Sequence, residues 1–308
     1  MKDMIIIGSG PAGMSAAVYA KRAMLDVLVV EQEAFCGGQI VNTSEVDNYL
    51  GFFGIDGYDM AMKFKEHIDH FEVPVQKGQV TEVKQQGGNW EVKLSDGGTL
   101  SSRTVLLAMG AKHRKLQIPG EQEYSGAGVS YCATCDGAFF KKKKVAVVGG
   151  GDVALEDALY LSKLCETVYL VHRREELRGA KLLQEQVLKT SNISFLPFYE
   201  VREILGEERV TGVRLIENQT GGEKQLDISG IFIAVGMEPD TGYLSDVVER
   251  DKTGYIKAQE NGVTSAEGIF VAGDCRTKQL RQIATAVSDG ANAVASAVKY
   301  LSGGHPSK

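Results

Sequence analysis

The sequence predicts an α/β fold in which two βαβ domains share one pattern and the second domain is inserted into the first. Three observations predict it. A short apolar run leads into a glycine-rich turn at Gly8 and again at Gly149, and each turn opens a stretch with helical periodicity. A second β-like run follows each helical stretch. The length of 308 residues suits about two domains.

The composition is that of an ordinary globular protein, with 43% hydrophobic and 24% charged residues. A net charge of −6 gives no indication of binding to nucleic acid or to an anionic membrane. No apolar stretch approaches the ~18 residues that a membrane helix needs. The apolar run Met4–Ile7 is also shorter than the roughly 7–15 residues of a signal peptide core. We therefore expect a cytoplasmic protein with no nucleic-acid or membrane partner.

The first turn reads Met-Ile-Ile-Ile-Gly-Ser-Gly-Pro-Ala-Gly over residues 4–13. In such a turn the first glycine makes the bend, the second lets the backbone approach a pyrophosphate, and the third lets helix and strand pack closely. The free N–H groups at the helix start favour phosphate. Glu31 ends the next β-like run, where a carboxylate accepts hydrogen bonds from ribose hydroxyls and repels a 2′-phosphate. This copy therefore predicts a site for FAD or NAD.

The second turn reads Val-Ala-Val-Val-Gly-Gly-Gly-Asp-Val-Ala over residues 145–154. His172 stands where the first copy has its acidic residue, and Arg173, Arg174 and Arg178 follow it. Guanidinium groups pair with phosphate through charged, often bidentate hydrogen bonds. A surface charge run is the plainer explanation for these arginines, but their place after the second strand favours the 2′-phosphate of NADPH.

Three further strand-like runs close on glycine, at residues 104–110, 230–236 and 268–273. Asp274 follows the last run, where it could contact a cofactor hydroxyl or simply serve as a turn acid. A helical pattern rich in small residues then extends over residues 283–300.

The first glycine turn and this last segment can share a domain without being neighbours in the sequence. We expect two Rossmann-like dinucleotide-binding domains. The first domain, with the Gly8 turn, would be discontinuous, with residues 1–112 and 246–308. The NADPH-binding domain, residues 113–245, would be inserted within it and would carry the cysteine pair.

The pair Cys132-Ala-Thr-Cys135, followed by Asp136, predicts redox chemistry. Cysteines at this spacing can close a small disulfide at a helix start, where a thiol pKa is lowered and the thiolate attacks disulfides. Zinc is the rival, but a structural site needs about four ligands and the other three of the five cysteines are scattered. We therefore expect no metal. Asp136 could exchange a proton with the dithiol or cap the helix.

These motifs together resemble those of the low-molecular-weight thioredoxin reductases of bacteria, over essentially the whole chain. The segment Cys132–Asp136, placed between the two nucleotide motifs, is the most diagnostic. The resemblance also rests on Gly8–Gly13, Gly37–Gln39, Gly149–Gly151, His172–Arg178, Gly273-Asp274 and Arg281-Gln282.

The resemblance implies FAD in the first domain, NADPH in the second, and thioredoxin or a similar small dithiol protein as acceptor. Electrons would pass from NADPH to the flavin and then to the Cys132–Cys135 disulfide. Cys132 would attack the protein substrate, Cys135 would face the flavin, and Asp136 would be the acid/base. The family is homodimeric, and its NADPH domain rotates between two poses.

The resemblance also assigns binding residues. Those for FAD are Gly8, Gly10, Pro11, Ala12, Gly13, Glu31, Gly38, Gln39, Asn48, Gly110, Gly273, Asp274, Arg281, Gln282 and Ile283. Those for NADPH are Gly149, Gly151, Asp152, Val153, His172, Arg173, Arg174 and Arg178.

Three residues depart from the family pattern. Val153 stands where the family often has Ser or Thr, so a hydroxyl that could contact the cofactor phosphates is absent. Cys36 and Cys275 lie in segments expected near the flavin, where each could be an extra redox thiol or a small buried packing residue.

Four other functions compete with this interpretation. A reductase fed by ferredoxin, or a dithiol oxidase that delivers electrons to oxygen, would have no use for the arginine cluster. The flavoprotein of a peroxide-reducing system would normally carry an extra N-terminal dithiol domain, whereas this chain starts directly at the first strand. A non-catalytic nucleotide sensor would not need both cysteines and Asp136.

Overall fold

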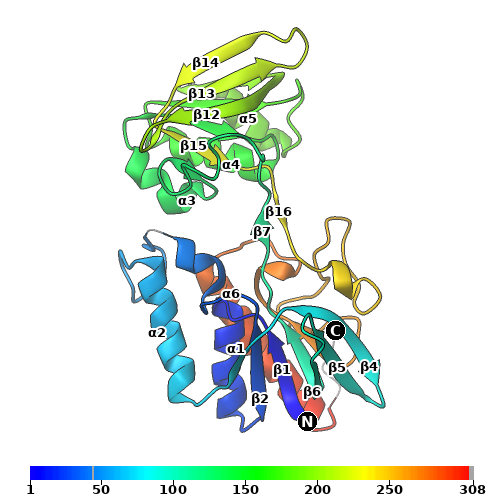
Figure 1. The fold of residues 1–308 in the computed structure, drawn as a ribbon. Coiled ribbons are helices and arrows are strands. Elements are labelled where there is room, and N and C mark those ends of the chain that lie inside the picture. The colour runs from blue at the N-terminus through cyan, green and yellow to red at the C-terminus, as the bar shows by residue number, and fades with distance from the viewer. Residues whose placement is uncertain (44, 305–308) are drawn as a thin grey trace. The chain divides into compact units, whose positions relative to one another are not determined.

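The computed structural model describes residues 1–43 and 45–304, and the chain forms two compact units (Figure 1). Unit 1 comprises Met1–Lys112 and Glu238–Lys308, and unit 2 comprises His113–Met237. The α/β class expected from the sequence is confirmed in both units.

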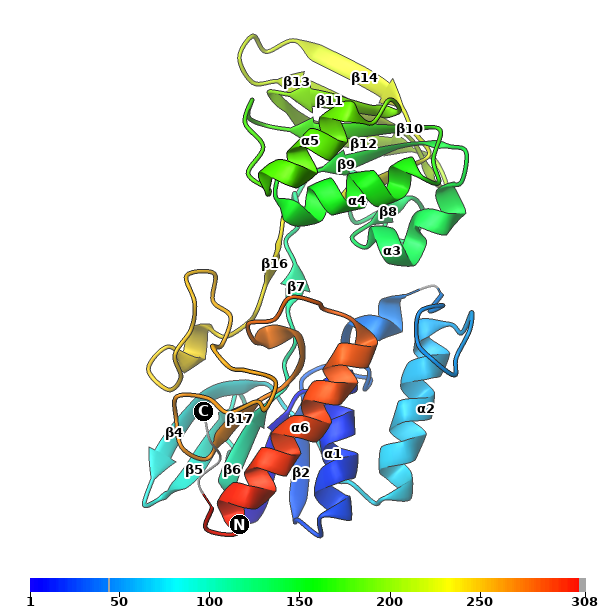
Figure 2. The ribbon, with the colours of Figure 1, turned by 180° about the vertical axis from the view of Figure 1, so that it is seen from behind.

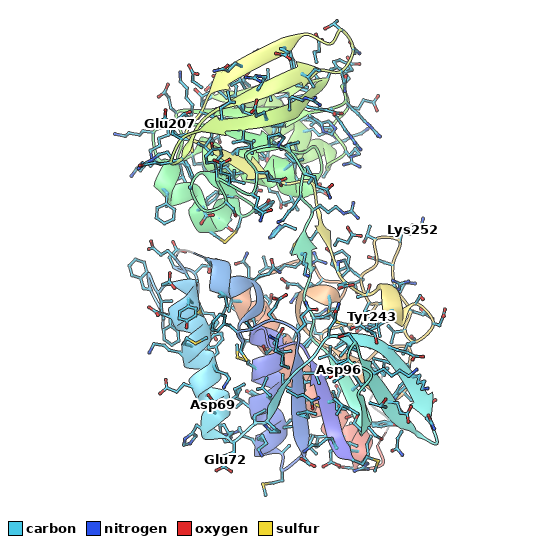
Figure 3. The ribbon with its side chains drawn as sticks, in the orientation of Figure 1. Asp69, Glu72, Asp96, Glu207, Tyr243 and Lys252 are labelled. Atoms are coloured by element: carbon cyan, nitrogen blue, oxygen red, sulfur yellow. A yellow bond between two sulfur atoms is a disulfide. The ribbon has the colours of Figure 1, made fainter. Side chains whose placement is uncertain are left out.

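The chain returns to unit 1 after Met237, earlier than the 245/246 boundary expected from the sequence. The 3-10 turn η3 (Gly242–Leu244) explains the difference. Its Leu244 is fully buried in a core of unit 1, and Tyr243, labelled in Figure 3, packs against the same core.

Unit 1 is built on a parallel sheet whose strands run in the order β3-β2-β1-β6-β17. Strand β6 is long enough to pair also with an antiparallel hairpin, β4 and β5. The bounds are β1 (Lys2–Ile7), β2 (Val27–Glu31), β3 (Val75–Lys77), β4 (Val80–Gln86), β5 (Asn89–Leu94), β6 (Thr99–Leu107) and β17 (Ile269–Val271).

Alternating residues of β1 enter two cores on opposite faces of this sheet, since side chains of a strand alternate with a period of two. Met4 and Ile6 face the helices α1 (Pro11–Arg22) and α6 (Ile283–Leu301), which lie side by side in Figure 2. The helices touch closely because Gly290 of α6 has no side chain: a Cβ there would lie 2.2 Å from the Ala12 carbonyl oxygen.

Unit 2 repeats this arrangement with a parallel sheet in the order β11-β10-β9-β15-β8. Its edge strand β8 precedes the glycine turn in the chain, whereas the equivalent β17 of unit 1 comes near the chain end. The bounds are β8 (Val129–Ser130), β9 (Lys144–Val148), β10 (Thr167–His172), β11 (Ile193–Pro197) and β15 (Gly230–Ile233).

The remaining elements surround the two sheets or join the units. A three-stranded antiparallel sheet, β12-β13-β14, belongs to unit 2, and β7 pairs with β16 where the chain crosses between units. The bounds are β7 (Lys112–His113), β12 (Tyr199–Gly206), β13 (Val210–Glu217), β14 (Glu223–Asp227), β16 (Met237–Glu238), α2 (Gly57–His70), α3 (Ala133–Asp136), α4 (Asp152–Ser162), α5 (Lys181–Lys189), η1 (Gly38–Asn42), η2 (Gly137–Phe140) and η4 (Gly273–Cys275).

None of the helices described is both long enough and apolar enough to cross a membrane.

Candidate functional site

The glycine turn of unit 1 joins β1 to α1 in a conformation that side chains would prevent. Gly8 has φ +102°, and a Cβ there would lie 2.5 Å from the Ala108 carbonyl oxygen. A Cβ on Gly13 would lie 1.9 Å from the Gly8 carbonyl oxygen. Helix α1 begins after Gly10 with Pro11 in its first turn and no side-chain cap. Its first amide groups are therefore available to an anion such as a pyrophosphate.

Other expected FAD residues gather around this turn. The Gly37 amide donates to the Ser9 carbonyl oxygen at 2.9 Å, and a Cβ on Gly38 would lie 3.3 Å from the Gly10 Cα. Gln39 donates through Nε2 to the carbonyl oxygen of Ala111, the neighbour of Gly110. On the α6 side, a Cβ on Gly273 would lie 2.9 Å from the Ala12 Cβ.

Glu31 ends β2 as a buried acid, with only 8% of its surface exposed. One of its oxygens, Oε2, accepts hydrogen bonds from the Ser9 amide at 2.7 Å and the Ser9 hydroxyl at 2.6 Å. The other, Oε1, accepts from the Glu33 amide at 2.9 Å. A cavity of about 300 Å³ opens beside Glu31 and is lined in part by Cys36 and Met62. A buried acid at such a cavity suits the ribose of an adenosine.

Asp274 carries a buried oxygen, Oδ1, that has no hydrogen-bond partner among the described residues. Burial raises the pKa of this carboxyl, and the nearby Lys278 and Arg281 oppose that rise. Buried polar atoms in folded proteins nearly always have partners. The orphaned oxygen therefore fits a hydroxyl of a bound flavin cofactor.

The start of α6 holds the last expected FAD residues. The Arg281 guanidinium stacks 4.1 Å from the centre of the Tyr255 ring. Gln282 caps α6, whose first residue is Ile283, and the Gln282 Oε1 accepts from Asn48 Nδ2 at 2.9 Å. The structure thus brings Asn48 to the same helix start as the residues that follow Asp274.

A buried ionic cluster behind Asp274 was not expected from the sequence. Asp289 of α6 accepts from the Gly273 amide at 3.0 Å, from Arg276 Nη2 at 2.6 Å and from Lys278 Nζ at 2.9 Å. All three charged side chains are about 5–6% exposed. Burial works against the Asp289 charge, but Arg276 and Lys278 hold the pKa of its carboxyl below the ordinary value. The cluster fixes the turn that carries Asp274.

The glycine turn of unit 2 has the same construction. Gly149 has φ +154°, and a Cβ there would lie 2.4 Å from the Ala234 carbonyl oxygen. Helix α4 begins after Gly151 without a side-chain cap. Asp152 Oδ1 accepts from the Ala180 amide at 2.7 Å, which ties the start of α4 to the segment after β10. Val153 is 59% exposed in the first turn of α4.

The basic segment after β10 is tied to this second turn. His172 is buried against Gly150, and its Nε2 has no partner among the described residues. Burial lowers the pKa of His172, and the charge of Arg178 lowers it further. The Arg178 amide donates to the Gly150 carbonyl oxygen at 2.6 Å. The exposed side chains of the segment, Arg173, Arg174 and Arg178, are free to meet an anion at the turn.

The cysteine pair lies at the start of α3, a helix of four residues that continues into η2. Cys132 and Cys135 form a disulfide. Ser130 was not expected from the sequence: its hydroxyl donates to Asp136 Oδ2 at 2.6 Å and accepts from the Cys132 amide at 3.1 Å. Burial raises the pKa of Asp136, and the hydrogen bond from Ser130 opposes that rise. A carboxyl of this kind can supply a proton at the disulfide.

A second group missed by sequence reasoning flanks the disulfide. The Tyr131 hydroxyl donates at 2.8 Å to Glu121, a carboxylate that is only 3% exposed. Glu121 also accepts from the Leu116 and Gln117 amides. No sequence signal pointed to Tyr131 or Glu121, because an isolated Tyr or Glu belongs to no motif. The group anchors the residue immediately before Cys132.

The other three cysteines, Cys36, Cys165 and Cys275, are unpaired and buried. Burial raises the pKa of Cys165 to about 11 and that of Cys275 to about 12. Thiols with such pKa values stay protonated near neutral pH, and protonated thiols are poor nucleophiles. Packing, rather than redox chemistry, is therefore the role that fits Cys275.

Comparisons with known proteins agree with this geometry. Residues 2–290 match the model of the family described as pyridine nucleotide-disulphide oxidoreductase. A thioredoxin reductase of Listeria monocytogenes is 44% identical over 97% of this chain and 93% of its own, and one of Bacillus subtilis is 42% identical over 97% and 94%. The solved thioredoxin reductase of Streptococcus pyogenes is 43% identical, covers 98% of this chain and 99% of its own, and superposes with a TM-score of 0.91.

The family match covers most of the chain, and the relatives named above match it over almost its full length at more than 40% identity. The solved structure shares the fold of this chain, and all three relatives are named as thioredoxin reductases. The chain therefore belongs to the thioredoxin reductases, pyridine nucleotide-disulphide oxidoreductases that use FAD and NADPH to reduce the disulfide of thioredoxin.

Proposed function

We propose that Cys132 and Cys135 are the redox pair of this thioredoxin reductase and that Asp136 is its proton donor. The observation that carries the proposal is the Cys132–Cys135 disulfide, with the Ser130–Asp136 hydrogen bond beside it. FAD, when bound, supplies a two-electron carrier between NADPH and this disulfide.

The dithiol reduces thioredoxin by thiol–disulfide exchange. Two electrons break the Cys132–Cys135 bond and leave two sulfur anions. The Cys132 thiolate attacks one sulfur of the thioredoxin disulfide, which forms a mixed disulfide and releases one thioredoxin thiolate. Cys135 then attacks Cys132, restores the protein disulfide and releases the second thioredoxin thiolate. We assign the attacking role to Cys132, which immediately precedes α3, and the flavin-facing role to Cys135, which lies within that helix.

Asp136 handles the protons that this exchange requires. Burial disfavours its ionised form, so the acid stays protonated to a higher pH than an exposed aspartate. Ser130 holds the carboxyl through Oδ2 and also bonds the Cys132 amide. Asp136 can therefore donate a proton to a sulfur anion of the pair and later recover it from solvent.

Each unit supplies the residues for one cofactor. In unit 1 the first turn of α1 would hold the FAD pyrophosphate, Glu31 the ribose, and Asp274 with the start of α6 the flavin half. In unit 2 the first turn of α4 would hold the pyrophosphate of NADPH, and the basic segment after β10 its 2′-phosphate. The orphaned atoms of Asp274 and His172 support these two placements.

We also propose a cytoplasmic homodimer. The three unpaired cysteines suit a reducing compartment, where disulfides other than catalytic ones are rare. Sedimentation equilibrium would test the dimer, and cell fractionation would test the compartment.

The test is anaerobic reduction of the bound flavin, followed by its absorbance, with NADPH and NADH compared side by side. We expect fast bleaching by NADPH and slow bleaching by NADH, because only NADPH carries the phosphate that the arginines can bind. If neither nucleotide bleaches the flavin, NADPH is not the electron donor. A reductase fed by ferredoxin or a dithiol oxidase would then be favoured.

A further inference from the structure

Four consecutive lysines, Lys141–Lys144, follow the disulfide segment directly and form what we call the basic edge. All four side chains are exposed, and none of them makes an ion pair with any residue that the structure describes. The chain as a whole carries a net charge of −6. The basic edge is thus a local concentration of uncompensated positive charge on an acidic protein.

The backbone holds the basic edge firmly in place. The Lys142 amide donates to the Leu164 carbonyl oxygen at 2.9 Å, and the Lys143 amide donates to the Phe140 carbonyl oxygen at 3.0 Å. Lys142 has φ +59°, a conformation that turns the chain sharply before β9. The Lys143 ammonium lies 5.7 Å from the centre of the Phe140 ring. The charges are therefore presented from a defined turn within unit 2.

The basic edge follows the disulfide closely along the chain. Cys135 lies in α3, which runs into η2, and η2 ends at Phe140, immediately before Lys141. Helical turns advance by about 1.5–2 Å per residue. The first lysine therefore lies on the order of 10 Å along these turns from Cys135.

Neighbouring charges leave the surplus intact. Glu166 lies beside the basic edge, since its amide donates to the Lys143 carbonyl oxygen at 2.9 Å. Glu166 and Lys163 are both exposed and carry opposite charges, so together they add no net charge near the four lysines.

We propose that the basic edge is an electrostatic docking surface for the acceptor, a thioredoxin whose face around its own disulfide is acidic. This inference rests on the proposed reduction of thioredoxin by the dithiol. Two proteins of net negative charge repel each other at long range, whereas a cationic patch beside the reacting group steers an acidic partner toward it. The basic edge thus raises the rate of encounter and orients the partner, while the chemistry stays with the cysteines.

The test compares the wild-type holoenzyme with the variant Lys141→Glu/Lys142→Glu, using a bacterial thioredoxin of net negative charge as the acceptor. We expect kcat/KM for thioredoxin to fall at least about tenfold at low salt, chiefly through a higher KM, and the difference to shrink as ionic strength rises. The rate of flavin reduction by NADPH without thioredoxin should be unchanged.

The matched control is Lys252→Glu/Lys257→Glu, which makes the same change in net charge on the surface of unit 1 (Lys252 is labelled in Figure 3). We expect this control to retain most of the wild-type kcat/KM. Equal kcat/KM and equal salt dependence in wild type and Lys141→Glu/Lys142→Glu would overturn the docking surface alone. If NADPH bleaches the flavin of the wild-type enzyme but the enzyme does not reduce thioredoxin, both the proposed acceptor and the docking surface are overturned.

Discussion

At the scale of single residues, Ser130 sets the state of the acid beside the disulfide. Its hydroxyl stands between Asp136 and the Cys132 amide, with hydrogen bonds of 2.6 and 3.1 Å. Burial raises the pKa of Asp136, and this hydrogen bond works in the opposite direction. The balance decides up to which pH Asp136 remains a proton donor.

The variant Ser130→Ala should raise the pKa of Asp136 further, because it removes the hydrogen bond that favours the carboxylate. The limb of the kcat profile that follows loss of the Asp136 proton should then move to higher pH. Asp136→Asn should remove that limb and lower kcat by about 10²–10⁴-fold. Superimposable pH profiles of wild type and Ser130→Ala would contradict the role given to Ser130.

The arginines after β10 should decide between the two nucleotides. We expect Arg174→Gln and Arg178→Gln each to raise KM for NADPH by about 10- to 100-fold, since each removes a charged hydrogen bond to phosphate. KM for NADH should hardly change. Arg209→Gln, at an exposed position elsewhere in unit 2, is the control. Equal effects on NADPH and NADH would mean that the cluster does not bind the 2′-phosphate.

At the scale of elements, a single buried acid joins α6 to the turn after β17. Asp289 accepts from the Gly273 amide and from the side chains of Arg276 and Lys278. Removing one partner of a buried ionic group leaves uncompensated charge, which costs about 3–5 kcal/mol. Asp274 belongs to the turn that this cluster holds in place. We therefore expect the orientation of its unpartnered Oδ1 to depend on the cluster.

We predict that Asp289→Asn weakens FAD binding at least about tenfold and lowers the melting temperature of the apoprotein. Because the pKa of Asp289 is lowered in the folded chain, its contribution to stability is present above the unfolded pKa and is lost as pH falls through the folded pKa. The stability difference between variant and wild type should therefore narrow in acid. Fluorescence of released FAD and thermal melts at two pH values measure both effects.

Asp69→Asn is the control for this variant, because Asp69 pairs with Lys65 on an exposed face of α2 (Figure 3). A surface pair of this kind contributes little to stability. If Asp289→Asn binds FAD as tightly as Asp69→Asn does, the cluster does not position the turn that carries Asp274.

Local signals explain which elements the sequence could predict. The strands and helices at both glycine turns could be predicted from the sequence, because apolar runs and glycine spacing are properties of neighbouring residues. The two-residue strand β8 and the Asp289 cluster were not. Val129 pairs with Ile231, and Arg276 meets a carboxylate thirteen positions away, so both depend on contacts that no local pattern records.

At the scale of the whole molecule, the position at which the chain returns to unit 1 also could not be predicted from local sequence. A sequence with Pro239 and Gly242 indicates a turn, but it cannot tell which unit the turn packs on. In the structure Leu244 is buried in unit 1, so the turn belongs to that unit and unit 2 ends at Met237. The spacing of Cys132 and Cys135 was enough to predict a redox pair. Ser130 and Tyr131 could not be predicted, because only the hydrogen bonds that they make in the fold link them to this segment.

Each unit has its own cores, so unit 2 should fold when it is expressed alone as residues 113–237. The Arg114 amide donates to the Gly236 carbonyl oxygen at 3.0 Å, and this hydrogen bond joins the two ends of the fragment. We expect a folded fragment that binds 2′,5′-ADP, contains the Cys132–Cys135 disulfide and takes up no flavin. Circular dichroism and calorimetry would check this, and an unfolded or yellow fragment would contradict the division of cofactors between the units.

The central claim is that electrons reach thioredoxin only through the Cys132–Cys135 pair. The most direct measurement is NADPH oxidation with thioredoxin as acceptor in wild type, Cys132→Ser and Cys135→Ser, together with anaerobic flavin bleaching in each. The account predicts that both variants lose at least about 10³-fold of thioredoxin turnover, a loss of the order seen when a covalent catalyst is removed, while NADPH still bleaches their flavin. Substantial turnover in either serine variant would contradict the account.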